Sequence, residues 1–99
     1  MPKAILAATT GADQSDEVIA DVLRLPVVFR CPGLAGAEVG QLQYKDSAGS
    51  WHDYYKDGSL EQCTATNTDA TAYGPGIYRI DKDATVASVP VDMSDSLYP

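Results

Sequence analysis

The stretch that decides the fold class is residues 22–31, which read VLRLPVVFRC. Apolar side chains alternate along it with a period of two residues, the pattern of a strand with one buried face. One face carries Leu23, Leu25, Val27, Phe29 and Cys31, and the other carries Val22, Arg24, Pro26, Val28 and Arg30. Because Pro26 cannot donate a hydrogen bond to a neighbouring strand, we expect it to separate a strand over Val18–Leu23 from one over Val27–Cys31.

Outward from this stretch, proline and glycine recur every several residues and leave few windows long enough for a typical helix. Asp57-Gly58 is the dipeptide of a two-residue hairpin loop, and Thr66–Thr71 is expected to be a loop. A short helix over Asp16–Leu25, capped by Ser15, is the one competing interpretation. Further strands are expected over Glu38–Lys45 with a bulge at Gly40, Trp51–Lys56, Leu60–Ala65, Ile77–Asp81, Thr85–Asp92 and, as an additional one, Lys3–Ala8. The sequence therefore predicts an all-β fold, a single-domain antiparallel β-sandwich, immunoglobulin-like or jelly-roll-like, of about seven strands.

A chain of 99 residues is long enough for one domain, which we expect to span residues 1–99. Extended tails are expected over about 1–10 and 93–99. Met1–Thr10 is a candidate for adding a strand to a neighbouring chain, and Leu97 and Tyr98 are candidates for docking into a partner. Ordinary fraying is the alternative for both tails.

Charge excludes several classes of partner. Fourteen acidic and seven basic residues give a net charge of −7, which repels phosphate backbones, so no nucleic acid is expected. The basic residues are scattered, and the apolar start Met1–Thr10 is too short for secretion or insertion, so no membrane is expected. We therefore expect the protein to be made in the cytoplasm. In that compartment Cys31 and Cys63 are expected to be two buried thiols rather than a disulfide.

No constellation of residues that would make an enzyme is present. His52 is the only histidine, and it lies between Trp51 and Asp53 with no nucleophile beside it in the sequence. The carboxylates fit no metal-binding loop, and two cysteines without a neighbouring histidine do not complete a zinc site. We expect no catalytic residues, no metal and no cofactor.

Aromatic residues supply the candidate contacts. Alternation puts Trp51, Asp53 and Tyr55 on one face of their strand and His52 and Tyr54 on the other. Such a cluster can stack on a sugar ring or seat a protein hot spot, or it can fill the space between the sheets. We expect Trp51 in the core. The residues expected to contact a partner are Tyr54, Tyr55, His52, Leu97 and Tyr98.

The segment Gly76-Ile77-Tyr78-Arg79-Ile80 resembles the tyrosine-corner strand of immunoglobulin-like sandwiches. In that strand a tyrosine bonds to the backbone upstream and lies two positions before an inward-facing residue, here Ile80. We therefore expect Tyr78 to stabilise the fold.

The whole layout is similar to that of the small β-sandwich accessory proteins of tailed bacteriophages. The quoted features are Thr-Thr-Gly at 9–11, Gly-Leu-Ala-Gly-Ala-Glu at 33–38, Leu42-Gln43 followed by a turn and Gly49-Ser50-Trp51, and 74–80. The resemblance implies a structural virion protein on the outer capsid surface, a decoration or cement protein. It would bind the major capsid protein as a homo-oligomer, a dimer or trimer. A carbohydrate- or host-binding module on a capsid or tail fibre is the alternative, and an inhibitor of a host enzyme is a third possibility.

Overall fold

The computed structural model describes residues 2–99, which contain strands and turns and no helix. The strands are β1 (Lys3–Thr9), β2 (Asp13–Gln14), β3 (Val18–Ala20), β4 (Val27–Arg30), β5 (Gly40–Lys45), β6 (Trp51–Asp53), β7 (Tyr55–Lys56), β8 (Ser59–Leu60), β9 (Gln62–Cys63), β10 (Asp69–Ala72), β11 (Gly76–Lys82) and β12 (Val89–Ser94). The all-β prediction is confirmed. The competing helix over Asp16–Leu25 is wrong, because that segment holds β3 and a turn.

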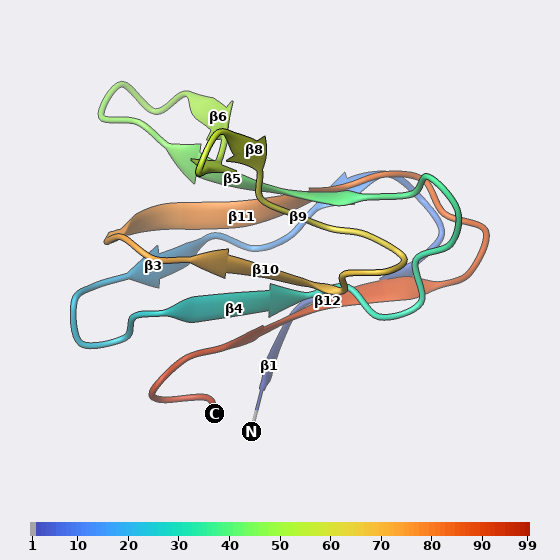
Figure 1. Ribbon diagram of the computed structural model, residues 1–99. Helices are drawn as coiled ribbons and strands as arrows, with labels where there is room; N and C mark the ends of the chain where they lie inside the picture. Colours follow the sequence, from blue (N-terminus) through green and yellow to red (C-terminus); the bar gives the residue numbers. More distant parts are fainter. Residues whose placement is uncertain (1) are drawn as a thin grey trace.

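Two antiparallel sheets form the layers of a sandwich (Figure 1). The four-stranded sheet has the order β1-β12-β4-β10. In the six-stranded sheet β11 and β5 are central, β2 and β3 pair with the outer edge of β11, and β6 and β9 pair with the outer edge of β5. The short hairpin of β7 and β8 forms a separate two-stranded sheet, and Figure 1 shows β8 next to β5 and β6.

The core fills the space between these sheets. Val27, Phe29 and Cys31 are fully buried from the four-stranded side, as the alternation predicts, and Leu42 and Ile80 are fully buried from the other. The Phe29 and Tyr78 rings meet across the layers, with centroids 6.5 Å apart. Burying such side chains stabilises a fold by about 1.5–3 kcal/mol each, so this layer of contacts holds the sheets together.

The tyrosine-corner prediction is confirmed. Tyr78 Oη donates a 2.6 Å hydrogen bond to the carbonyl oxygen of Gly74, and Ile80 points into the core. Burial raises the pKa of the Tyr78 hydroxyl, so it stays a neutral donor.

Residues 2–99 contain twelve strands where seven, or eight with Lys3–Ala8, were expected, because two predicted strands are divided and β2 and β10 were not predicted. The run 51–56 splits where β6 leaves β5 and β7 pairs with β8. The predicted hairpin loop between β7 and β8 is confirmed: Asp57 and Gly58 have φ angles of 52° and 82°, both in the left-handed region.

The predicted loop over 66–71 is wrong in its second half. Residues Asp69–Ala72 form β10, which pairs with β4 in register from Asp69 opposite Arg30 to Ala72 opposite Val27. Ala70 and Ala72 are fully buried. Their small side chains look like loop residues in sequence, whereas in the fold they face a crowded core.

The bulge expected at Gly40 is also wrong, since β5 begins there in unbroken register with β11. A side chain at Gly40 would place its Cβ 2.7 Å from Cys31 Sγ and 3.0 Å from Ile80 Cγ2. The glycine therefore serves close packing. The register shifts lie instead between β1 and β12.

The two cysteines are free and fully buried, as expected. The neighbouring Cys31 side chain, together with burial, raises the pKa of the Cys63 thiol, whose Sγ donates a 3.7 Å hydrogen bond to the Phe29 carbonyl. Both sulfurs therefore behave as small apolar groups of the core.

Candidate functional site

The predicted aromatic cluster is divided between core and surface. Tyr54 is half-buried, and its ring meets the Tyr78 ring edge-on at 5.7 Å between centroids. Tyr55, in the hairpin of β7 and β8, is 61% exposed. His52 is exposed on β6. The structure therefore leaves Tyr55 and His52 accessible and uses most of Tyr54 for packing.

The expectation that Trp51 lies in the core is wrong. Its ring is half-buried on the outer face of the sheet, with the Arg79 guanidinium 4.3 Å and the Lys45 ammonium 5.8 Å from the ring centroid. Cations over an aromatic face are attracted by its π electrons. Phe29 and Tyr78 fill the space between the sheets that the sequence assigned to Trp51.

His52 forms an imidazole–carboxylate pair. Its Nε2 lies 2.6 Å from Asp46 Oδ2, and its ring stacks on Tyr44 with centroids 5.3 Å apart. The hydrogen bond from His52 lowers the pKa of the Asp46 carboxyl, with help from the Ser50 and Ala48 amides. Within residues 2–99 no hydroxyl or thiol bonds to this imidazole, so the pair closes the turn between β5 and β6.

Leu97 and Tyr98 lie in a turn fixed by Asp95. Asp95 Oδ1 accepts hydrogen bonds from the Leu97 and Tyr98 amides, and the Asp95 amide donates to the Tyr98 carbonyl. Tyr98 packs against the core, whereas Leu97 is 60% exposed. The turn thus presents Leu97 outward on a fixed backbone.

A second turn, Asp21–Arg24, lies beside it. Leu23, predicted to be inward-facing, is 83% exposed because β3 ends at Ala20 and the chain turns there. Asp21 Oδ1 accepts from the Leu23 amide, an Asx turn that competes with the strand. Ser96 Oγ donates a 2.8 Å hydrogen bond to the Leu23 carbonyl and couples the two turns.

We call the turns 21–24 and 95–98 together the docking surface. A hollow of about 320 Å³ lies between them, lined by Asp21, Leu23, Arg24, Ser96 and Leu97. Two leucines, 83% and 60% exposed, therefore lie beside this hollow. Sequence reasoning found Leu97 and missed Leu23, although Asp21 was a signal that the strand ends.

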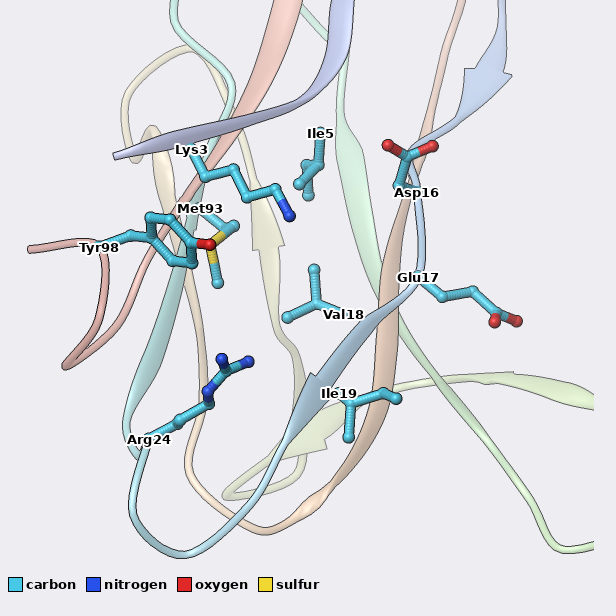
Figure 2. A pocket seen from close by; sticks show the side chains of 9 residues that line it. All are labelled: Lys3, Ile5, Asp16, Glu17, Val18, Ile19, Arg24, Met93 and Tyr98. Carbon is cyan, nitrogen blue, oxygen red and sulfur yellow. The ribbon is translucent and has the colours of Figure 1, made fainter. Parts of the chain in front are cut away.

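A second cavity opens next to the docking surface, and we call it the wedge pocket (Figure 2). Its volume is about 210 Å³. It is lined by Lys3, Ile5, Asp16, Glu17, Val18, Ile19, Arg24, Met93 and Tyr98. Arg24 borders both cavities, so its guanidinium is the basic group they share.

No metal-binding cluster of three or more histidine, cysteine or acidic side chains is found within residues 2–99. The described chain also has no helix long and apolar enough to cross a membrane. No family model, curated protein or solved structure matches this chain.

Proposed function

We propose that this chain is a structural virion protein of a tailed bacteriophage. In this proposal it decorates the outer surface of the capsid and stabilises contacts between subunits of the major capsid protein. It is made in the host cytoplasm, acts without catalysis or a cofactor, and assembles as a dimer or trimer. The resemblance stated above supports the virion assignment, and the docking surface supports a binding role.

The docking surface is the observation that carries the proposal. Leu23 and Leu97 are held side by side by the hydrogen bond between Ser96 and the Leu23 carbonyl, so little conformational entropy is lost when a partner covers them. Burying an exposed leucine contributes about 1.5–3 kcal/mol. A rigid pair of such side chains is a suitable anchor for a protein surface.

Area and charge agree with this role. The accessible surface is 5339 Å², and a stable interface takes about 800 Å² from each partner, so one end of the sandwich suffices. The net charge of −7 disfavours contact with packaged nucleic acid and suits the outside of a shell. Several copies acting together would add avidity.

Co-sedimentation with capsids tests the proposal. Empty capsids are assembled from the major capsid protein encoded in the same genome, and bound chain is measured after pelleting. We expect Leu23→Asp and Leu97→Asp each to weaken binding at least tenfold, because a carboxylate replaces about 1.5–3 kcal/mol of apolar burial. Val86→Asp is the matched control, since Val86 is 89% exposed in the β11–β12 loop at the other end of the sandwich.

The outcomes are distinct. Retained binding by Val86→Asp with loss in both leucine variants supports docking through this surface. Absence of binding by the parent chain, or a genome without capsid genes, would overturn the virion assignment. Light scattering on the eluted protein measures the oligomer, and a strict monomer would contradict the dimer or trimer.

A carbohydrate- or host-binding module is the second candidate, favoured by the exposed aromatics near the hairpin. Tyr55 and Tyr73 are both at least half exposed, and the Lys56 ammonium lies 4.2 Å from the Tyr73 ring centroid. Exposed rings of this kind stack on sugars. Glycan-array binding that is lost in Tyr55→Ala or Tyr73→Ala, with Leu23→Asp unaffected, would favour this candidate over capsid docking.

A further inference from the structure

The wedge pocket forms where the free edges of the two sheets separate. β1 is the outer strand of one sheet and β3 lies on the outer edge of the other. The Asp16 amide donates a 2.9 Å hydrogen bond to the Ile5 carbonyl and joins the edges at that point. Beyond it the two strands diverge (Figure 2), and the gap between them is the pocket.

Its inner wall is apolar and rigid. Ile5, Val18 and Met93 are at least nine-tenths buried and belong to three different strands. The Tyr98 ring closes one side (Figure 2). Because these side chains are part of the core, the wall is present before any ligand arrives.

Two cations point into this apolar space. Figure 2 shows the Lys3 ammonium entering from β1 and the Arg24 guanidinium entering from the opposite end. Within residues 2–99 neither side chain donates a hydrogen bond, and the Lys3 ammonium lies 5.5 Å from the centroid of the Tyr98 ring. Arginine carries donors that match a carboxylate, so the Arg24 end of the pocket is suited to an anion.

Asp95 supports Arg24 from outside the pocket. Arg24 Nε lies 4.0 Å from Asp95 Oδ2, a fully buried oxygen that has no hydrogen-bond partner among the described residues. This attraction acts on Nε, and Figure 2 shows the terminal nitrogens of Arg24 turned toward the pocket. Asp95 is therefore a positioning residue for the guanidinium.

Two acidic groups also border the pocket, at the end away from Arg24. The Glu17 carboxylate turns outward (Figure 2) and pairs with the Lys45 ammonium at 3.0 Å. The Asp16 carboxylate lies at the rim near Ile5. Each end of the pocket therefore carries a cation, and the Arg24 end is the one without a carboxylate among the lining residues beside it.

We propose that the wedge pocket binds a monocarboxylate with a short apolar body. The carboxylate faces the Arg24 guanidinium, the Lys3 ammonium adds a second positive charge, and the apolar body packs on Val18 and Met93. The volume of about 210 Å³ is below the roughly 300–1,000 Å³ of drug-sized sites, so the ligand is short. Two sources carry this chemistry: a free acid, or the last residue of a peptide.

Hexanoate is the probe, and methyl NMR of the full chain is the measurement. We expect the Ile5, Val18 and Met93 methyl signals to shift saturably, with a dissociation constant in the millimolar range or below for so small a ligand. Hexanamide has the same body without the charge, and we expect it to bind at least tenfold more weakly. Acetyl-Gly-Leu, with its carboxylate free or amidated, tests the peptide source.

Matched variants locate the charge. Arg24→Gln is expected to weaken hexanoate binding at least tenfold and Lys3→Gln about threefold, whereas Lys56→Gln, in the hairpin, leaves it unchanged. If Arg24→Gln does not fold, the proposal is tested by Lys3→Gln and by the comparison of hexanoate with hexanamide.

Equal shifts with hexanoate and hexanamide, or shifts confined to methyls outside the pocket, would overturn the proposal. A lower dissociation constant for hexanoate than for free acetyl-Gly-Leu assigns the site to a free acid. A lower dissociation constant for acetyl-Gly-Leu assigns it to the C-terminal residue of a peptide. The site goes beyond capsid docking, and because its test needs no capsid, one proposal can fail while the other stands.

Discussion

At Gly40 the interior has no room for a methyl group. The site faces Cys31 Sγ and Ile80 Cγ2, and both atoms belong to fully buried side chains. Interiors packed at this density respond to a change of one carbon atom. The glycine is required here because of neighbours that are distant in sequence.

Gly40→Ala is therefore expected to destabilise the fold by about 1–3 kcal/mol, the usual cost of overpacking. Urea denaturation measures the change. Gly11→Ala is the control, because a Cβ there would meet only Thr9 Oγ1 at 3.7 Å, an ordinary contact. Combining Gly40→Ala with Cys31→Ala should recover part of the loss, and a double variant no better than the sum of the singles would argue against the clash.

The Tyr78 hydroxyl provides a second test at this scale. Tyr78→Phe keeps the ring between the sheets and removes the 2.6 Å hydrogen bond to the Gly74 carbonyl. We expect a loss of about 0.5–1.5 kcal/mol in the free energy of unfolding. Tyr55→Phe, at an exposed hydroxyl of the same kind, should change it by less than about 0.5 kcal/mol. Equal effects from the two variants would remove the tyrosine corner as a source of stability.

Strands β4 and β10 are linked by an ion pair as well as by their ladder. Arg30 donates from Nε and Nη2 to the two Asp69 oxygens at 2.7 and 3.1 Å. The hydrogen bonds and charge of Arg30 lower the pKa of the Asp69 carboxyl in the folded state. The pair is partly exposed, so its contribution is at the level of a surface pair, about 0.5–1 kcal/mol.

This pair gives a pH dependence of known sign. A depressed pKa stabilises the fold above the carboxyl's unfolded value of about 3.9, and the contribution is lost as the pH falls through the folded value. Asp69→Asn should therefore be less stable than the parent at pH 7, and the difference should shrink below about pH 4. Denaturation curves from pH 7 to 2.5 measure it. A difference that stays constant over this range would mean that the Asp69 charge does not contribute.

Some elements could be predicted from the sequence and others could not. Alternation found β4 and β11 because one face of each is buried by large side chains such as Phe29 and Ile80. It missed β10, whose inward residues are alanines, and it extended β3 into the turn that exposes Leu23. Periodicity reports which residues are apolar, and it does not report where a chain turns away from the core.

The candidate site was predictable only in part for the same reason. Leu97 was found because it is apolar in a polar tail. Arg24 was placed on the outer face of a strand, and Lys3 was one of several scattered basic residues. Their meeting in the wedge pocket depends on two turns and two sheet edges that come together only in three dimensions. No spacing in the sequence brings them together.

For the whole molecule, the two sheets share one core. Phe29 belongs to the four-stranded sheet and is fully buried against the other, where its ring lies 6.5 Å from that of Tyr78. Neither sheet alone could bury its inner apolar face from water, since each of these faces is covered by the other sheet. The sandwich should therefore unfold as one cooperative unit.

Phe29→Ala tests this unity. Removing a buried phenyl ring costs about 3–5 kcal/mol, a large part of the roughly 5–15 kcal/mol that stabilises a domain of this size. Trp51 lies in the opposite sheet beneath Arg79, and its fluorescence reports on that sheet alone. We expect far-ultraviolet circular dichroism and Trp51 fluorescence to give one shared unfolding midpoint in the parent, and the two signals to shift together in the variant. If Phe29→Ala does not fold, Phe29→Leu makes the same test with a smaller loss of folding free energy. In the variant, the Trp51 fluorescence transition could keep the parental midpoint while the circular dichroism transition moves. That result would show that the two sheets unfold separately and that the shared core does not hold them together.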